Sequence, residues 1–209
     1  MSKLDLSTVP KHLLACREPK SGSNIITPIG RLSFPHLFHA KAMGQDADSK
    51  KKFSLSMLIP PSCDLTLLKQ ICSETAAAKW GDKAGSMKLK TPFLDAGEFE
   101  YEGYEEGWTL IRASALTKPS VVHQKGADII KLTDDDESEA YPGRWCIATL
   151  NAFAYDTKGN KGVSFGLNNV FLLNHDDSLG GKMKAEDEFE AVADYTGGDA
   201  AEGSIDALF

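Results

Sequence analysis

Apolar and polar residues alternate most clearly in one segment, where Phe53, Leu55, Met57 and Ile59 take every second position. Such alternation predicts a β-strand with one buried face, and the proline pair that follows is expected to end it. Further apolar runs, each bounded by turn residues, predict strands over residues 24–38, 108–116, 121–132, 144–155 and 162–173. Pro35 lies inside the first of these runs and predicts a break, a bulge or a sheet edge there.

One segment has helical rather than strand spacing. Its apolar side chains fall on one stripe of a helix: Leu67, Leu68, Ile71 and Cys72. Ser62 or Asp64 suits the N-terminal cap, and Gly81, directly after Trp80, suits the C-terminal stop. Strands joined by short turns, with one inserted helix, predict a mainly-β barrel or sandwich. Because the five-stranded OB-type barrel is the member of that class that commonly binds oligonucleotides, we expect an OB-fold-like barrel with extra hairpins.

The two ends of the chain differ in composition from this strand-rich centre. Residues 1–23 mix charged residues with prolines and predict a loosely held N-terminal arm, followed by an OB-fold domain over residues 24–181. The C-terminal segment covers residues 182–209. From Glu186 onward it carries eight acidic side chains and no basic one. Such a composition cannot bury enough apolar surface to offset the entropy of ordering, so it predicts a disordered acidic C-terminal tail.

The tail suits three roles that the sequence leaves open. An acidic arm resembles a nucleic-acid backbone and can cover the protein's own basic groove. Alternatively its tip, with Asp206, Leu208 and Phe209, docks into a pocket of a partner protein. The third interpretation is a tail that only keeps the protein soluble, because chain ends are commonly disordered.

The charge of the chain is unevenly distributed, although its formal total is −7. Residues 1–94 hold fourteen basic and seven acidic side chains, and residues 140–173 hold three and one. Residues 95–139 hold four basic and twelve acidic side chains, and residues 174–209 hold two and ten. Since the acidic side chains are concentrated in one central segment and the tail, the negative net charge does not exclude a folded domain that binds nucleic acid.

Signals of enzymatic chemistry are weak. The chain has no phosphate-cradling glycine loop, no GxSxG and no HExxH motif, and its four cysteines form no CxxC pair. The acidic cluster at residues 134–137 lacks the glycine and distal glutamate of a calcium loop, so a solvated loop is the simpler interpretation. We therefore expect no enzyme, no cofactor and no metal. Without a signal peptide or a long apolar run, we expect a cytoplasmic protein with no membrane contact.

Binding to single strands needs cations for the phosphates and ring faces for the bases. One segment combines both. Arg31 and Lys41 supply charge, and Phe34, His36 and Phe38 supply rings. Each phenylalanine suits the hydrophobic core equally well, so the sequence leaves its role open.

Three further basic sets are candidates for the same surface. They are Lys50, Lys51 and Lys52 in a polar loop; Trp80, Lys88 and Lys90 at and after the helix end; and Tyr155, Lys158 and Lys161 at the turn of the last hairpin. The lysine run also suits a solvated loop, and Trp80 also suits the core. Phe153 on the last hairpin is expected rather to be half-buried in the core. Tyr101 and Tyr104 lie among acids and are expected to stack only if the neighbouring glutamates point away.

Five motifs occur in a fixed order along the chain. They are GRLSFPHLF at residues 30–38, FSLSMLIP at 53–60, KWG at 79–81, KP at 118–119 and KGVSFGL at 161–167. Together they resemble a family of phage single-stranded-DNA-binding proteins, formerly a domain of unknown function, over about residues 27–181. The resemblance implies an OB fold and a role in DNA replication, recombination or repair, in which the protein protects transient single strands.

The acidic tail is also similar to the tails of bacterial and podophage single-strand binders. Those tails contact replication proteins through the tip and compete with DNA for the groove. Here Ala207 and Leu208 separate the acids from Phe209, which departs from the dense acidic run of such tails.

We therefore expect a non-catalytic phage protein that binds single-stranded DNA irrespective of sequence in the cytoplasm of the host. Its tail is expected either to cover the DNA groove or to bind phage or host replication proteins. Two alternatives stay open, a metal-dependent nuclease that uses the acidic cluster and a scaffold that recruits partners. The oligomeric state also stays open.

Overall fold

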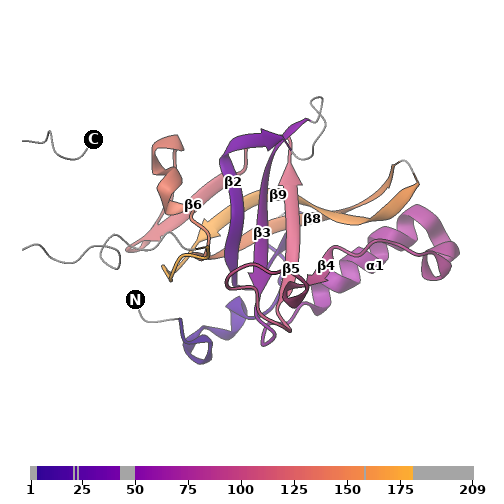
Figure 1. The fold of residues 1–209 in the computed structure, drawn as a ribbon, viewed down its shortest axis with the longest axis horizontal. Helices are drawn as coiled ribbons and strands as arrows, with labels where there is room; N and C mark the ends of the chain where they lie inside the picture. Colours follow the sequence, from indigo (N-terminus) through magenta and orange to yellow (C-terminus); the bar gives the residue numbers. More distant parts are fainter. Residues whose placement is uncertain (1–3, 21, 23, 43–49, 158, 181–209) are drawn as a thin grey trace, which may run out of the picture.

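A ring of five strands forms the centre of the molecule in the computed structural model, which describes residues 4–20, 22, 24–42, 50–157 and 159–180 (Figure 1). In ring order the strands are β8 (Trp145–Thr157), β2 (Gly30–Ala42), β3 (Lys51–Ile59), β5 (Thr109–Ala115) and β9 (Asn160–Leu172). Pairing of β8 with β9 closes the ring, and only the β5–β9 pairing within it is parallel. This is the connectivity of a five-stranded OB-like barrel, so the predicted fold class is confirmed for the described residues.

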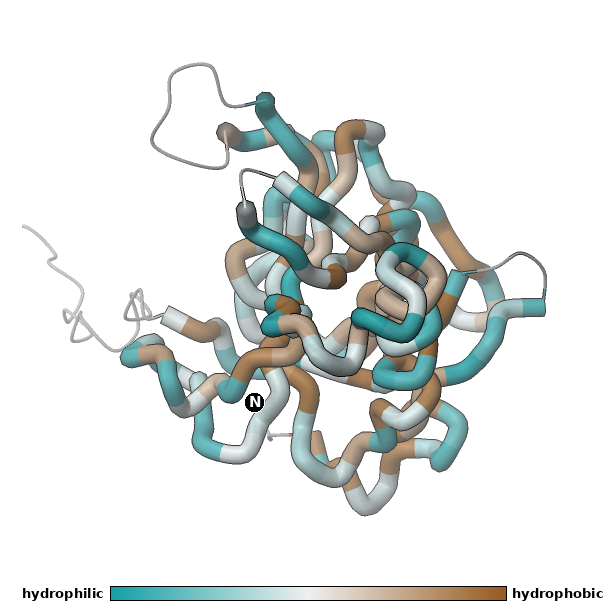
Figure 2. Tube along the Cα trace, turned by 90° about the vertical axis from the view of Figure 1, so that its right-hand side faces the viewer, coloured by the Kyte–Doolittle hydropathy of each residue, from teal (hydrophilic) through white to brown (hydrophobic). Residues whose placement is uncertain are grey.

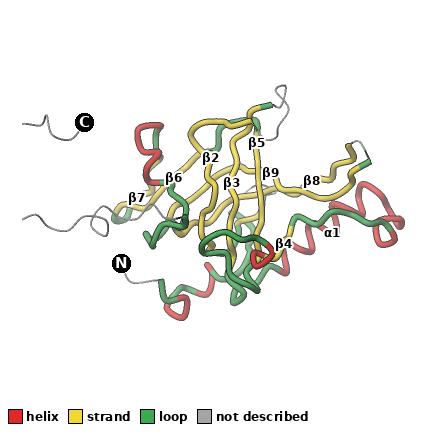
Figure 3. Tube along the Cα trace, viewed as in Figure 1, coloured by secondary structure: helices red, strands yellow, loops and turns green. Residues whose placement is uncertain are grey.

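The alternation seen in the sequence sets the two faces of β3. Leu55, Met57 and Ile59 belong to the main hydrophobic core inside the barrel. Ser54 and Ser56 lie on the outer face, because successive side chains of a strand point to opposite sides. Figure 3 shows how strands dominate the trace, with most of the helical residues gathered in one segment.

Strand β2 contains the irregularity predicted at Pro35. Ser33 pairs with Ser56 and His36 pairs with Ser54, so β2 carries one extra residue between the two pairs. Phe34 lies in this bulge with φ of 42°, a left-handed conformation that is uncommon for a non-glycine residue. The bulge turns the Phe34 ring outward, where it is 51% exposed.

The α-helix of the described region, α1 (Thr66–Trp80), lies between β3 and β5 in sequence. Asp64 accepts a hydrogen bond from the backbone N–H of Thr66 over 2.8 Å, which satisfies one free donor at the helix start. Gly81 follows the last turn with φ of 58°, as its position in the sequence predicted. Leu68, Cys72 and Ala76 are buried, and the helix covers one side of the barrel below the β8–β9 hairpin (Figure 1).

Short elements decorate the barrel. They are β1 (Ile25–Ile26), β4 (Phe93–Asp95), β6 (Ser120–Lys125), β7 (Asp128–Lys131) and the 3₁₀ turns η1 (Leu6–Thr8), η2 (Lys11–Leu13), η3 (Gly81–Ser86), η4 (Ala96–Glu98) and η5 (Asp134–Glu139). β6 and β7 form a hairpin beside β9, where the apolar run over residues 121–132 predicted a strand. Hydrophilic segments line much of the periphery of the trace (Figure 2). No helix in the described part of the chain is both long and apolar enough to cross a membrane.

The N-terminal arm is attached to the barrel, so the expectation of a loosely held arm is wrong for residues 13–17. The backbone N–H of Ile29 donates to the carbonyl of Leu13 over 2.7 Å, and Arg17 and Ile26 exchange two backbone hydrogen bonds. Leu13 also packs on a second apolar cluster that contains Trp145. The predicted tail from residue 182 onward lies outside the described residues.

Candidate nucleic-acid interface

The outer face of β2, β3 and β5 forms an open groove of about 450 Å³. Strand pairing places Ser54 opposite Ser114 and Ser56 opposite Arg112 on this face, and His36 lies opposite Ser54 on the other side. We call Ser54, Ser56, Ser114 and Ser164 the serine floor, since all four line the groove. Small hydroxyl side chains leave the floor low enough for a flat ligand to approach the backbone of the sheet.

One end of the groove is aromatic. The aromatic cluster consists of Phe34, Phe99, Tyr101 and Tyr104. Ring centroids of Phe34 and Tyr101 lie 5.3 Å apart in an edge-to-face arrangement, and both side chains are about half exposed, at 51% and 52%. The guanidinium of Arg112 lies 5.1 Å from the centroid of the Phe99 ring. A cation and two exposed ring faces therefore share this end.

The aromatic cluster is held from below by a polar contact. The hydroxyls of Tyr104 and Ser33 lie 3.0 Å apart in a hydrogen bond. Burial raises the pKa of Tyr104, while the bond to Ser33 and the charge of Arg112 act in the opposite direction. Tyr104 therefore keeps its proton at neutral pH and serves as a packed support rather than as a charged group.

The other end of the groove is basic. A second hollow of about 320 Å³ shares Ser114 with the groove and is lined by Lys50, Lys52 and Phe153. Lys41 pairs with Lys52 across β2 and β3. Lys51 is exposed but points to the other side of β3, because side chains alternate along a strand.

The β8–β9 hairpin continues this surface beyond the barrel. Phe153 pairs with Ser164 and is 42% exposed, and Tyr155 pairs with Gly162 two residues further along. The backbone of Lys90 bridges to the same hairpin, with its N–H donating to the carbonyl of Lys161 over 2.9 Å. The structure thus brings two basic sets that are far apart in sequence to one place.

Several side chains at this place are charged and accessible. Lys88 and Lys90 are exposed, and the ammonium of Lys161 lies 3.1 Å from the carboxylate of Asp156 on the partner strand. Lys158 lies outside the described residues. An exposed ion pair of this kind contributes little to stability, so Lys161 is free to exchange its partner for a phosphate.

Besides Lys51, three predicted site residues do not reach the groove. Phe38 is only 4% exposed and belongs to the main core, so the prediction that its ring stacks on a base is wrong for this structure. Trp80 is half-buried and packs against the same core. The Arg31 guanidinium donates to the carbonyls of Gly143 and Asp177 and pairs with Asp176, so it is occupied within the protein.

His36 lies in the groove with a lowered pKa. Burial is the main cause, and the positive charge of Lys41 adds to it, while Glu137 opposes the shift. His36 is therefore neutral at pH 7 and contributes a ring and hydrogen-bonding nitrogens rather than a charge.

Four residues of this surface are not predicted by the sequence or are predicted in another role. Arg112 is not among the predicted site residues, and Phe153 is expected in the core. Phe99 and Tyr101 lie in an acidic segment, and the many carboxylates there argue against a surface that binds DNA. The position of Arg112, between the buried Ile111 and Ala113, is the available clue. A charged residue at an outward position of a predicted strand marks the solvent-facing side of the sheet.

The acidic cluster at residues 134–137 has partners within the protein. Asp134 forms an ion pair with Lys118, and Asp136 accepts hydrogen bonds from the backbone and the hydroxyl of Thr133 in a capping box at the start of η5. These contacts lower the pKa of both carboxylates. Among the described residues no three His, Cys, Asp or Glu side chains are grouped as metal ligands.

Comparison with known proteins identifies the family of the chain. Residues 23–200 match the family model of the single-stranded-DNA-binding protein of Enterobacter phage Enc34. No curated protein sequence is significantly similar to the chain.

Two of the solved structures that share the fold come from one phage protein. The single-stranded-DNA-binding protein of bacteriophage Enc34 in complex with single-stranded DNA is 23% identical, with a TM-score of 0.59, over 75% of this chain and 89% of that chain. A second structure of the same phage protein is 22% identical, with a TM-score of 0.58, over 80% of this chain and 90% of that chain. The family match covers most of the sequence, and the proteins of that family are not enzymes, which argues against the nuclease alternative. The chain therefore belongs to the family of the Enterobacter phage Enc34 single-stranded-DNA-binding protein, a family of non-enzymatic phage proteins that bind DNA.

Proposed function

We propose that single-stranded DNA lies along the outer face of β2, β3 and β5, from the aromatic cluster over the serine floor to the lysines and the β8–β9 hairpin. The observation that carries this proposal is the continuity of the surface. The aromatic end, the floor and the basic end adjoin one another on the face that OB barrels use for oligonucleotides.

The binding is proposed to be independent of sequence. Ring faces of Phe34, Tyr101 and Phe153 stack on any base, and each such contact is worth roughly 1–3 kcal/mol. Lysines at the other end neutralise phosphates and release counterions, which carries no sequence information. The proposed residues are Phe34, His36, Lys41, Lys50, Lys52, Lys88, Lys90, Phe99, Tyr101, Arg112, Phe153, Tyr155 and Lys161, with Lys158 as a further candidate outside the described residues.

We also propose the biological setting that the resemblance implied. The protein covers transient single strands during phage DNA replication, recombination or repair in the host cytoplasm. Its acidic segment from Glu186 onward competes with DNA for the groove, or residues Asp206, Leu208 and Phe209 dock to a replication protein. What supports this is the contrast between eight acidic side chains in that segment and the lysines that flank the groove.

A direct test compares Arg112→Ala with Lys125→Ala, using the fluorescence anisotropy of a labelled dT oligonucleotide. Arg112 lines the groove, and Lys125 is an exposed cation at the end of β6. We expect Arg112→Ala to weaken binding about tenfold, because it removes a phosphate partner and the cation above Phe99. Equal affinities of the two variants would contradict the proposed surface.

A second test concerns the acidic segment. Truncation after residue 185, which removes Glu186 to Phe209, is expected to tighten binding to the same oligonucleotide at low salt, because an internal competitor is removed, and to change it little at high salt. A truncated protein that binds equally well or more weakly at low salt would show that the segment does not compete for the groove.

A further inference from the structure

The chain returns to the aromatic end of the groove after β9. Leu179 is only 9% exposed and packs with Leu58, Ala96 and Leu110 in a separate apolar cluster. Leu179 and Gly180 also line a small cavity of about 110 Å³ together with Phe34, Tyr101 and Tyr104. Residues 174–180 therefore form one wall of the aromatic cluster, although they follow the last barrel strand.

Two glycines leave room for this segment. A Cβ atom on Gly103, which has φ of 77°, would lie 2.1 Å from a methyl carbon of Leu179. A Cβ atom on Gly143, which has φ of 104°, would lie 2.2 Å from the carbonyl oxygen of Asp177. The backbone N–H of Leu179 donates to the carbonyl of Pro142 over 3.0 Å. The absence of side chains at Gly103 and Gly143 thus leaves space for this segment in two other loops of the protein.

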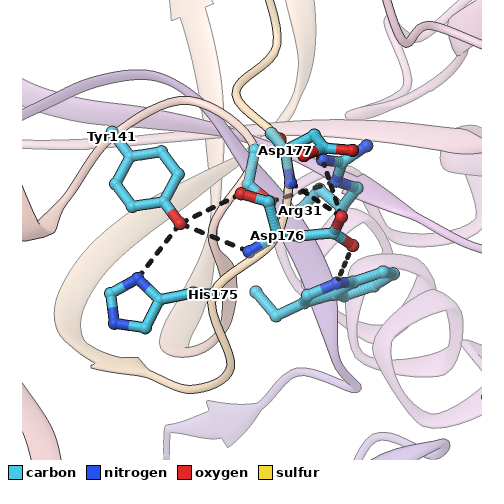
Figure 4. A network of polar contacts seen from close by, with 7 residues as sticks. Arg31, Tyr141, His175, Asp176 and Asp177 are labelled. Carbon is cyan, nitrogen blue, oxygen red and sulfur yellow. Dashed lines mark hydrogen bonds and ion pairs between the residues drawn. The ribbon is translucent and has the colours of Figure 1, made fainter. Parts of the chain in front are cut away.

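A polar network fixes the segment just before Leu179 (Figure 4). The indole N–H of Trp145 donates to Asp176 Oδ2 over 2.7 Å, and the Arg31 guanidinium lies 3.8 Å from Asp176 Oδ1 and also donates to the carbonyl of Asp177. The Tyr141 hydroxyl donates to the carbonyl of Asp176 over 3.1 Å. Asp176 is buried, with its side chain 3% exposed, so these contacts hold a charged group away from water.

We propose that residues 174–180 position the base-stacking rings, with Leu179 as the positioning residue and the Arg31–Asp176–Trp145 contacts as its anchor. Leu179 lines the cavity behind Phe34 and Tyr101, and Tyr104 packs against the apolar cluster to which Leu179 belongs. This inference rests on the proposed function, because it assigns a role within the same groove. It also explains why Arg31, a cation beside the groove, is turned into the protein.

The position of Gly180 adds a consequence for the acidic segment. Since Gly180 lines the cavity behind the aromatic cluster, the last residue that the structure describes lies at the aromatic end of the groove and not at the lysine end. Competition between this segment and DNA is therefore expected to begin at the stacking rings.

The test is a double-mutant cycle of Leu179→Ala and Tyr101→Ala, measured as the affinity for a labelled dT oligonucleotide. We expect Leu179→Ala alone to weaken binding about five- to tenfold, and to have less than about a twofold effect when Tyr101 is already alanine. Leu179→Met keeps the volume and is expected to bind like the wild type. Leu173→Ala, a half-buried leucine of another cluster, is the matched control and is expected to change affinity little.

A second readout separates positioning from general destabilisation. The slope of log affinity against log salt is expected to stay unchanged in Leu179→Ala, because the substitution removes no cation that binds a phosphate. Independent, multiplicative effects of Leu179→Ala and Tyr101→Ala would overturn the positioning role while leaving the proposed groove intact. A Tyr101→Ala variant with wild-type affinity would instead reject the stacking surface itself, and the positioning role with it.

Discussion

The two ends of the groove are built differently, although both lie on one outer face of the barrel. At the aromatic end four rings contact one another and are supported by Leu179 and the Asp176 network. At the basic end Lys50, Lys52 and Phe153 surround an open hollow. A stacking site needs rings held in one geometry, whereas a phosphate site needs only charge within reach. The difference predicts that the first end supplies salt-independent affinity and the second supplies salt-dependent affinity.

The largest expected effect comes from removing the stacking rings. The double substitution Phe34→Ala and Tyr101→Ala should weaken oligonucleotide binding by at least about 30-fold, because each ring contributes roughly 1–3 kcal/mol. The slope of log affinity against log salt should stay unchanged. Anisotropy titrations at several salt concentrations measure both quantities. An affinity loss that disappears at high salt would mean that the rings act through the charges around them.

The next effect concerns the support of the aromatic end. Burial acts to raise the pKa of Asp176, but hydrogen bonds from Trp145 and Asp177 and the charge of Arg31 lower it overall. A carboxylate with a lowered folded-state pKa contributes stability above its unfolded pKa of about 3.9, and this contribution is lost as pH falls through the folded value. Asp176→Asn should therefore reduce the free energy of unfolding by about 1–3 kcal/mol at pH 7, and by progressively less as pH falls below the unfolded pKa of about 3.9.

The matched control for that change is Asp177→Asn, since the Asp177 side chain is exposed. Thermal unfolding at pH 7 and at acidic pH gives the comparison. Equal stabilities of the two variants at pH 7 would show that the Asp176 network does not hold the segment.

Charge removal at the basic end should have a smaller effect that depends on salt. Lys50→Ala with Lys52→Ala should weaken binding several-fold at low salt and less at high salt. The salt slope should fall by about 0.7 for each phosphate of a single strand that is no longer neutralised. If the affinity of this variant drops equally at all salt concentrations, the basic end does not supply the salt-dependent part of the affinity, and the proposed difference between the two ends is wrong.

The smallest effect involves His36, between the two ends. Its pKa is lowered by burial and by Lys41, so it gains its proton at a lower pH than an ordinary histidine does. Because the protonated ring adds a positive charge to the groove, DNA affinity should rise by about twofold as pH falls toward 5. Affinity titrations of the wild type and His36→Gln across this range make the comparison. The prediction fails if both proteins gain affinity to the same extent.

The sequence predicted the barrel better than the groove. Alternation along β3 identifies which of its side chains point into the barrel, because one face of the strand packs in the main core. The same local pattern does not show which strands become neighbours. Arg112 and Tyr101 join Phe34 only after β5 pairs with β3 and the chain between β4 and β5 folds over the barrel.

Phe34 and Phe38 illustrate the limit most clearly. They lie four residues apart on one strand, and the sequence allows the same two roles for both. The bulge at Phe34 turns one ring outward, and the continuation of β2 buries the other. Arg31 shows the same limit for charge, since its partner Asp176 lies far along the chain.

Photo-crosslinking of a dT oligonucleotide that carries 5-iodouracil tests the central claim most directly, because mass spectrometry identifies the residues beside the bases. The account predicts crosslinks at Phe34, Tyr101 and Phe153 on the outer face of the barrel. Crosslinks that map to the β6–β7 hairpin, with none in the groove, would contradict it.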